Sequence, residues 1–170
     1  MPSFLLKKTT LLAYGVALAA IVFDQLTKWW VVDRLGMQLG QTIEISPIFD
    51  LTYTLNTGVS FGMFSGGEAR WVLAGFSLIV AAVMSWWALR AQRRLFALAL
   101  GLIIGGALGN VIDRILVGAV IDFLDFSGLG FPWIFNIADS AISVGVGLLI
   151  LDSFLSERQS GPVGSEPQTE

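Results

Sequence analysis

The chain has 170 residues, of which 55% are hydrophobic and 14% are charged, and its net charge is −3. Soluble globular proteins carry about 25% charged residues, so this chain is too apolar for that class. The small net charge and the lack of a long basic run exclude a nucleic-acid partner. The composition indicates an integral membrane protein with one domain.

The sequence contains no cysteine and no histidine. Disulfides, thiolate nucleophiles and cysteine metal sites are therefore excluded, and so is a Ser-His-Asp triad. The commonest general base is also missing. Any catalysis must use carboxylates, a Ser/Lys pair, or a metal held by oxygen ligands alone.

Four apolar runs are long enough to cross roughly 30 Å of hydrocarbon as helices. They cover residues about 11–32, 71–89, 95–112 and 137–154. The first run follows Lys7 and Lys8 and so resembles a signal peptide, but it lacks a small-residue cleavage site and continues to Trp30. We therefore interpret it as a retained membrane helix.

The first run also contains Asp24 and Lys28, which lie four residues apart. With the acid nearer the N-terminus, this is the favourable order for an ion pair on one helix face. We interpret the two residues as a structural pair near the outer interface, with Lys28 reaching towards headgroups, because no serine lies close by in sequence to form a catalytic pair.

Residues 37–67 have a different pattern. Apolar and polar residues alternate from Ile43 to Asn56, with a break at Ser46-Pro47, which indicates a half-buried strand. A turn is expected at 56–58, followed by a second short segment, Val59 to Phe64. Together they predict a small hairpin or sheet outside the bilayer core, because open strand edges are not tolerated in lipid.

The third run contains glycines spaced four apart, Gly101, Gly105 and Gly109, which permits close contact with another helix. The last residues, 157–170, are polar and rich in glycine and proline, so we expect a disordered tail there. The rest, 1–156, is expected to be a single membrane-embedded domain, with no internal repeat.

The basic residues predict the topology. If every apolar run crosses the membrane, six basic residues lie on the side of both termini: Lys7, Lys8, Arg90, Arg93, Arg94 and Arg158. Three lie on the opposite side: Arg34, Arg70 and Arg114. Positive charge concentrates in the cytoplasm, so both termini are expected there. The strand-like segment and the connection 113–136 then face outward.

The chemistry is expected in the stretch 105–140, which holds four aspartates, Asp113, Asp122, Asp125 and Asp139. Ionisable groups beside membrane spans are functional candidates. Two carboxylates held close together share a proton, so that one can activate water while the other polarises a carbonyl. Spacing alone leaves open which two of Asp113, Asp122 and Asp139 would pair.

Other roles for these acids stay open at this point. Asp139 could favour the N-terminus of the fourth helix, Asp113 could pair with Arg114, and Asp125 could be a solvated loop acid. A proton-coupled transporter would use such acids as a relay, but it needs a polar path, and the second and third runs carry almost no polar residues. A non-catalytic scaffold would leave the acids unexplained.

Five short stretches in this order resemble the lipoprotein signal peptidase (signal peptidase II) family of bacterial membrane aspartic proteases. They are Asp24-Gln-Leu-Thr-Lys28, Asn56-Thr-Gly-Val-Ser-Phe-Gly62, Gly105-Gly-Ala-Leu-Gly-Asn-Val-Ile-Asp-Arg114, Val120-Ile-Asp-Phe123 and Phe135-Asn-Ile-Ala-Asp-Ser-Ala141. Any one of them is a weak signal, but five in order across four apolar runs are specific.

The resemblance implies an all-α membrane protein with four transmembrane helices and a small extracytoplasmic β-domain. It implies that Asp122 and Asp139 are the catalytic dyad. Residues that line the site or bind substrate would be Asn56, Gly58, Asn110, Arg114 and Asn136. Residues of more structural character would be Asp24, Lys28 and Asp113.

The implied reaction is hydrolysis of the peptide bond before a diacylglyceryl-modified cysteine in a prolipoprotein, with no metal and no cofactor. The resemblance places the enzyme in the bacterial cytoplasmic (inner) membrane, among membrane lipids. We expect a monomer with both termini in the cytoplasm and an active site near the extracytoplasmic face.

Overall fold

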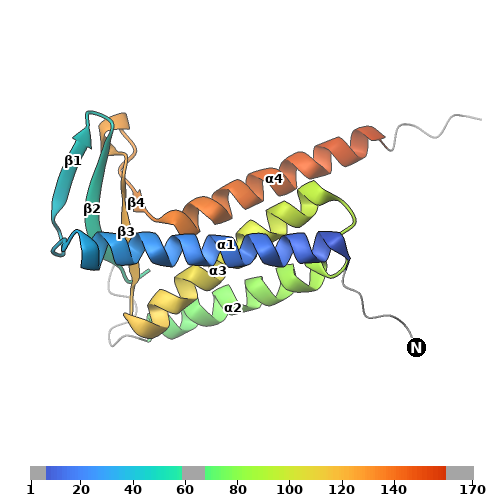
Figure 1. The fold of residues 1–170 in the computed structure, drawn as a ribbon, viewed down its shortest axis with the longest axis horizontal. Coiled ribbons are helices and arrows are strands. Elements are labelled where there is room, and N and C mark those ends of the chain that lie inside the picture. Colours follow the sequence, from blue (N-terminus) through green and yellow to red (C-terminus); the bar gives the residue numbers. More distant parts are fainter. Residues whose placement is uncertain (1–6, 59–67, 160–170) are drawn as a thin grey trace, which may run out of the picture.

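The computed structural model describes residues 7–58 and 68–159. Within this part, four long helices run side by side and a small sheet lies at one end of them (Figure 1). The helices are α1 (Lys8–Trp29), α2 (Ala69–Ala88), α3 (Arg94–Leu116) and α4 (Ile137–Gln159). All four are long and apolar enough to cross a membrane, which confirms the expectation from the sequence.

Most helix ends differ from the predicted ranges by a few residues. A π-helical turn, η1 (Trp30–Arg34), continues α1 beyond the predicted end of the first run. The last helix, α4, extends to Gln159, so residues 157–159 are helical and the expectation of a disordered tail was wrong for them. Residues 160–170 and the predicted segment Val59 to Phe64 lie outside the described residues.

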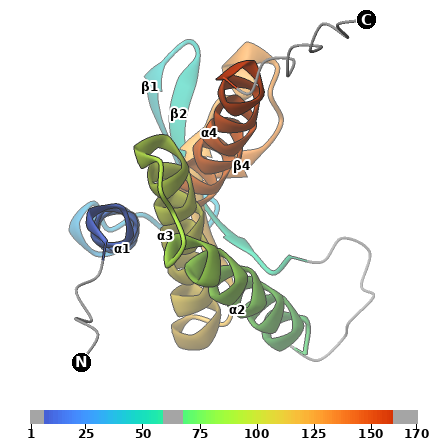
Figure 2. The same cartoon turned by 90° about the vertical axis from the view of Figure 1, so that its right-hand side faces the viewer.

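Helix α3 occupies the centre of the bundle, with α1, α2 and α4 around it (Figure 2). Its glycines make this packing possible: a Cβ on Gly105 would lie 2.6 Å from the Ala17 carbonyl oxygen of α1. Gly106, on the neighbouring face, meets the Ala138 carbonyl of α4 in the same way. The small-residue face predicted from the sequence is thus in close contact with its neighbours.

The outer helices expose large apolar side chains. On α2, for example, Phe76 and Ile79 are 66% and 64% exposed. Monomeric soluble proteins rarely leave such continuous apolar surface in contact with water. Surrounding hydrocarbon explains it, because lipid tails solvate these side chains as well as a protein core would.

The sheet has four antiparallel strands in the order β1-β2-β3-β4. They are β1 (Thr42–Ser46), β2 (Phe49–Asn56), β3 (Val120–Asp125) and β4 (Ile134–Phe135). A short 3₁₀ turn, η2 (Ser127–Leu129), follows β3. The sheet therefore joins two segments that lie far apart in the sequence, one after α1 and one between α3 and α4.

The predicted strand pattern needs two corrections. The hairpin turn falls at Pro47 and Ile48, where the sequence pattern showed only a break in one strand, and Thr42 pairs with Thr52 across it. Proline cannot donate to a strand ladder, so it belongs in the turn. Strand β3 escaped prediction because its first four residues, from Val120, are all buried and show no alternation.

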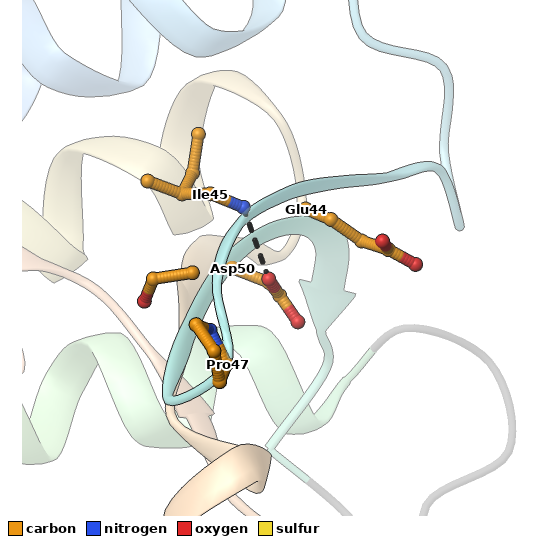
Figure 3. Close-up of a pocket in the computed structure, with 5 residues that line it drawn as sticks. Glu44, Ile45, Pro47 and Asp50 are labelled. Atoms are coloured by element: carbon orange, nitrogen blue, oxygen red, sulfur yellow. Dashed lines mark hydrogen bonds between the residues drawn. The ribbon is translucent and has the colours of Figure 1, made fainter.

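The hairpin tip contains an open hollow of about 490 Å³ (Figure 3). It is lined by Glu44, Ile45, Ser46, Pro47 and Asp50, and the Asp50 carboxylate accepts a hydrogen bond from the Ile45 N–H at 3.1 Å. None of the site residues predicted from the sequence is among these. The hollow belongs to the turn, and we assign no function to it.

A second apolar core fixes the sheet to the helices. Val31 in η1 packs with Leu51 of β2 and with Ile121 and Phe123 of β3. All four side chains are buried. As a result, the strand that carries Asp122 has a defined position relative to the end of α1.

Candidate active site

Asp122 lies on β3, where the sheet meets the ends of α3 and α4, and it is only 1% exposed. The antiparallel register sets Thr54 opposite Asp122 and Asn56 opposite Val120. From this place at the end of β2, Asn56 Nδ2 donates a 3.0 Å hydrogen bond to Asp122 Oδ2. The pairing of two distant strands thus brings Asn56 to the carboxylate.

Asn136 connects Asp122 with Asp139. Its Nδ2 donates to Asp122 Oδ1 at 2.7 Å, and its Oδ1 accepts the backbone N–H of Asp139 at 2.9 Å. In return, the backbone N–H of Asn136 donates to Asp139 Oδ2 at 3.4 Å. This reciprocal pair over three residues has the geometry of a capping box, so the start of α4 itself holds Asp139 beside Asp122.

Asn110 of α3 completes the set of donors. Its Nδ2 donates to Asp139 Oδ1 at 2.8 Å, and its Oδ1 accepts from Asn136 Nδ2 at 3.2 Å. Each oxygen of both carboxylates therefore accepts a hydrogen bond from an amide. The structure brings Asp122, Asp139, Asn56, Asn110 and Asn136 together as the sequence resemblance implied.

The pKa of Asp122 is raised to about 6, first by burial and then by the negative charge of Asp139. Hydrogen bonds from Asn56 and Asn136 oppose the rise. Burial beside a second carboxylate thus favours the protonated form of Asp122.

Asp125, three residues further along β3, has the opposite environment. It accepts hydrogen bonds from the Thr52 hydroxyl at 2.7 Å and from the Ser127 N–H at 2.9 Å, and these lower its pKa. Asp125 is thus a half-buried acid at the end of β3 that stabilises the strand and the turn after it, and its interpretation as a solvated loop acid was wrong.

Arg114 and Gly58 lie at the border of the site. Arg114 Nη1 donates to the Asn110 carbonyl at 3.2 Å, and its guanidinium is close enough to Asp113, Asp122 and Asp139 to interact with their charges. Gly58 has a φ of +76°, as the predicted turn requires, and a Cβ there would meet the side chain of Leu73. Glycine at this position lets the turn pass close to α2.

An opening of about 560 Å³ leads to Asp122 from outside. It is lined by Thr54, Leu55, Asn56, Thr57, Gly58, Asp122, Pro132, Trp133 and Ile134. The opening lies between the end of β2 and the connection before β4. A substrate backbone could reach the carboxylate at this point, next to the 67% exposed ring of Trp133.

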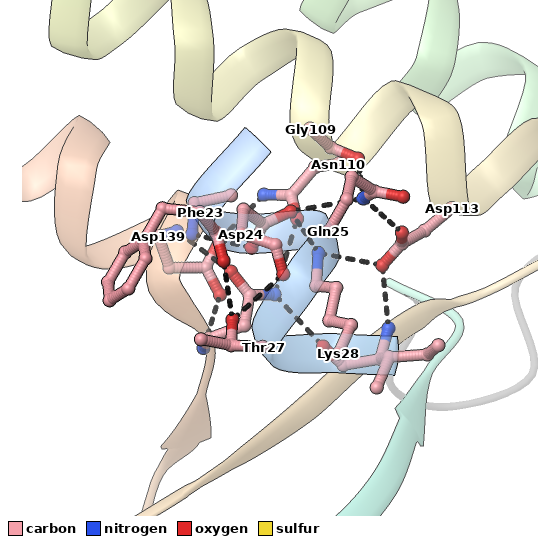
Figure 4. Close-up of polar contacts among 12 residues, drawn as sticks. Phe23, Asp24, Gln25, Thr27, Lys28, Gly109, Asn110, Asp113 and Asp139 are labelled. Carbon is pink, nitrogen blue, oxygen red and sulfur yellow. Dashed lines mark hydrogen bonds and ion pairs between the residues drawn. The ribbon is translucent and has the colours of Figure 1, made fainter. Parts of the chain in front are cut away.

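Asp24, Lys28 and Asp113 form a buried ion cluster behind the site (Figure 4). Lys28 is only 2% exposed, so the interpretation that it reaches towards headgroups was wrong. Asp113 pairs with Lys28 and not with Arg114, its neighbour in the sequence. Gln25, which the sequence analysis did not single out, donates to Asp113 Oδ1 at 2.9 Å; its polar side chain in an apolar run was the available signal.

Among residues 7–58 and 68–159, no group of three or more acidic side chains is arranged to hold a metal ion. The polar groups that meet at the site are carboxylates, side-chain amides and one guanidinium. Together they can bind and orient a peptide backbone and move a proton between water and a carbonyl oxygen.

In the described part of the chain, four helices able to cross a membrane carry at one end the buried carboxylate of Asp122 beside the half-buried carboxylate of Asp139, as expected for a membrane protein of the aspartic-peptidase type. A family model described as signal peptidase (SPase) II matches residues 16–155. This chain belongs to the signal peptidase II family, and it is a membrane peptidase.

Relatives and solved structures agree with the family. Two proteins named lipoprotein signal peptidase are similar to the chain. The one from Caulobacter vibrioides is 47% identical over 92% of this chain and 95% of its own length. The one from Beijerinckia indica is 45% identical over 86% of this chain and 89% of its own length. Two structures, each described as a bacterial membrane enzyme, superpose with TM-scores of 0.75 and 0.72. The first is 29% identical to this chain and covers 91% of it and 93% of its own length. The second is 32% identical and covers 82% of this chain and 90% of its own length.

Proposed function

We propose that this protein removes the signal peptide from diacylglyceryl-modified prolipoproteins by hydrolysing the bond before the lipidated cysteine. Its membership of the signal peptidase II family supports the reaction, as do the names of its relatives. Substrates would be membrane-anchored and would arrive by diffusion within the bilayer.

Asp122 and Asp139 would be the catalytic dyad, with one proton between them. Asp122, whose pKa is raised to about 6, holds the proton. Asp139 takes a proton from water as the water oxygen attacks the scissile carbonyl carbon, and Asp122 gives its proton to the carbonyl oxygen. The resulting gem-diol collapses: the C–N bond breaks, Asp139 protonates the leaving nitrogen, and a hydroxyl proton returns to Asp122.

The observation that carries this proposal is the connection of both carboxylates through one residue, Asn136. It holds Asp122 and Asp139 in a fixed relative position before substrate binds, which is a requirement for proton transfer in both directions. Asn56 and Asn110 hold the remaining oxygens. Arg114 would bind the substrate backbone beside them, and Gly58 would leave room for it.

The proposed placement in the membrane follows from charge. Six basic residues are expected at the end of the bundle that holds the termini and the α2–α3 connection, and three at the other end. The sheet, whose strand β3 carries Asp122, lies at the other end of the bundle (Figure 1). We therefore place the sheet and the site at the extracytoplasmic face of the inner membrane, with both termini in the cytoplasm.

The enzyme would work as a monomer among membrane lipids, and the chemistry of the dyad needs no metal and no cofactor. The apolar exposed surface of α2 is long enough to face lipid across the hydrocarbon layer. The acyl chains of a lipidated substrate can remain in that layer while the scissile bond reaches the site.

Cleavage of a purified precursor tests the proposal. The wild-type protein in lipid should cleave a diacylated precursor and leave the unlipidated precursor intact. Asp122→Asn and Asp139→Asn should each lose more than about 10³-fold in kcat, the scale of loss when a member of a catalytic unit is removed. Asp125→Asn, on the same strand, is the matched control and should keep its rate. Normal turnover by either dyad variant would refute the dyad.

A further inference from the structure

Lys28 holds two buried aspartates on two different helices. Its Nζ lies 2.7 Å from Asp24 Oδ2 within α1 and 2.8 Å from Asp113 Oδ2 on α3. The side chains of all three residues are at most 3% exposed. The ammonium group is therefore an ionic bridge between α1 and α3 (Figure 4).

Each of these aspartates also binds the backbone immediately before a member of the proposed dyad. Asp24 Oδ1 accepts the N–H of Ala138, the residue before Asp139, at 2.9 Å. Asp113 Oδ2 accepts the N–H of Ile121, the residue before Asp122, at 3.0 Å. Lys28 is therefore linked by the same short path to both backbone segments.

The first of these contacts is unusual for a helix start. In α4, Asn136 caps the helix by accepting the N–H of Asp139, which leaves the preceding N–H groups without a partner inside the helix. Asp24, from another helix, accepts the N–H of Ala138. The direction of the first turn of α4 thus depends on the position of the Asp24 carboxylate.

The contact between Asp113 and the Ile121 N–H fixes the position of strand β3 in the same way. Ile121 packs in the core beneath the sheet, and its N–H points to Asp113 at the C-terminal end of α3. Gln25 closes the cluster, because its Nε2 donates to Asp113 Oδ1 at 2.9 Å and to Asp24 Oδ2 at 3.2 Å. Each of the four carboxylate oxygens thus accepts at least one hydrogen bond.

We propose that Lys28 is a positioning residue for the hydrolysis: through Asp24 and Asp113 it sets the distance between the backbone of Asp139 and that of Asp122. This inference rests on the proposed dyad. Stability alone does not explain the arrangement, because apolar residues of similar volume usually stabilise a buried site as well as an ion cluster does. Geometry does explain it, because small displacements of reacting groups cost much of the rate.

Two variants separate positioning from folding. Lys28→Met removes the bridge and leaves two carboxylates without a cation. The triple variant Asp24→Asn, Lys28→Met, Asp113→Asn has the same shape, no buried charge, and side-chain oxygens that can still accept both N–H groups. It keeps the test valid if Lys28→Met does not fold. The control is Arg93→Met, which breaks the 2.7 Å ion pair with Asp152 at the other end of the bundle.

The measurements are kcat and KM on the diacylated precursor, with amide hydrogen exchange of the segments that contain Ile121 and Ala138. We expect both variants to lose about 100-fold in kcat while KM changes by less than about 3-fold, the result of misplacing catalytic groups by roughly 1 Å. Exchange should rise in both segments together. Arg93→Met should change neither the rate nor the exchange there.

The proposal is overturned if the triple variant keeps kcat within about 10-fold of the wild type, since Lys28 would then serve only to neutralise charge. It is also overturned if the loss appears in KM, or if Arg93→Met loses as much activity. Failure of the dyad is distinguishable: Asp122→Asn in the same assay would then turn over normally, whereas failure of the positioning role leaves that variant inactive.

Discussion

Asn136 Nδ2 donates a 2.7 Å hydrogen bond to Asp122 Oδ1, although the two residues come from different elements and share no local sequence constraint. The same asparagine begins the helix that carries Asp139. One side chain therefore determines both the partner of Asp122 and the orientation of α4. Its replacement should affect catalysis and stability together.

We expect Asn136→Ala to lower kcat by about 100-fold, because the two carboxylates lose their common donor. Loss of the cap and of a buried hydrogen-bond partner should also destabilise the fold by about 1–3 kcal/mol. Turnover of the diacylated precursor and thermal unfolding in detergent measure the two effects. Asn56→Ala is the matched control: Asn56 is exposed and caps no helix, so its loss should slow turnover with less effect on unfolding.

Stability should depend on pH through Asp122. Its pKa is raised from 3.8 to about 6 in the folded protein, so the folded state binds the proton more tightly than the unfolded state does. The contribution of Asp122 to the free energy of unfolding is therefore complete below pH 3.8 and is lost as the pH rises through about 6. Asp122→Asn removes this dependence and should be more stable than the wild type at pH 7, by up to about 3 kcal/mol. Equal melting temperatures from pH 4 to pH 7 in both proteins would contradict the assignment.

The rate should respond to the same proton. If Asp122 must hold it to protonate the substrate, kcat/KM of the wild type falls as the pH rises through an apparent value near 6 for the free enzyme. This value belongs to the coupled pair of Asp122 and Asp139. Initial rates at low substrate concentration from pH 4.5 to 8.5 measure it. A rise in kcat/KM across that range would reverse the acid and base roles of the two aspartates.

Replacing Gly109 tests the close approach of α3 to Asp24 in the ion cluster. A Cβ at this position would lie 2.8 Å from Asp24 Oδ2, so Gly109→Ala must displace that carboxylate or separate the helices. We expect about a 10-fold loss of kcat, smaller than for Lys28→Met because a shift of a few tenths of an ångström suffices. Gly15→Ala on α1 is the control, since nothing lies within 4 Å of its Cβ position. That change should leave the rate unaltered and stabilise the helix by about 0.5–1 kcal/mol.

The proposed topology can be tested without background labelling because the chain has no cysteine. Glu44→Cys in β1 should react with a membrane-impermeant maleimide added to intact spheroplasts, whereas Arg90→Cys after α2 should react only once the membrane is opened. Labelling with the opposite pattern would place the sheet in the cytoplasm, and the proposed side of the active site would be wrong.

The sequence by itself determined the class of protein and the limits of its chemistry. Apolar runs of about 20 residues must be helical in lipid, because every backbone N–H and C=O has to be satisfied there, so four helices followed from length and composition. The absence of histidine and cysteine left carboxylates as the simplest catalytic groups. Both conclusions depend on local properties, which a sequence contains in full.

Local patterns did not predict strand β3 or the ion cluster. Strand β3 is short and buried on both faces, so it lacks the alternation that revealed β2. Lys28 looked like an interfacial residue because its partner Asp113, 85 positions away, cannot be inferred from a spacing of four to Asp24. The family resemblance suggested Asp122 and Asp139, but not how they are held.

Only the tertiary structure decided which groups meet. Asn56 reaches Asp122 through the β2–β3 register, and Asn136 reaches it because β4 ends where α4 begins. Burial at that junction and the charge of Asp139 then raise the pKa of Asp122. Contact, burial and charge proximity arise between distant segments once the helices pack, and for that reason the working geometry of this site belongs to the fold and not to any stretch of sequence.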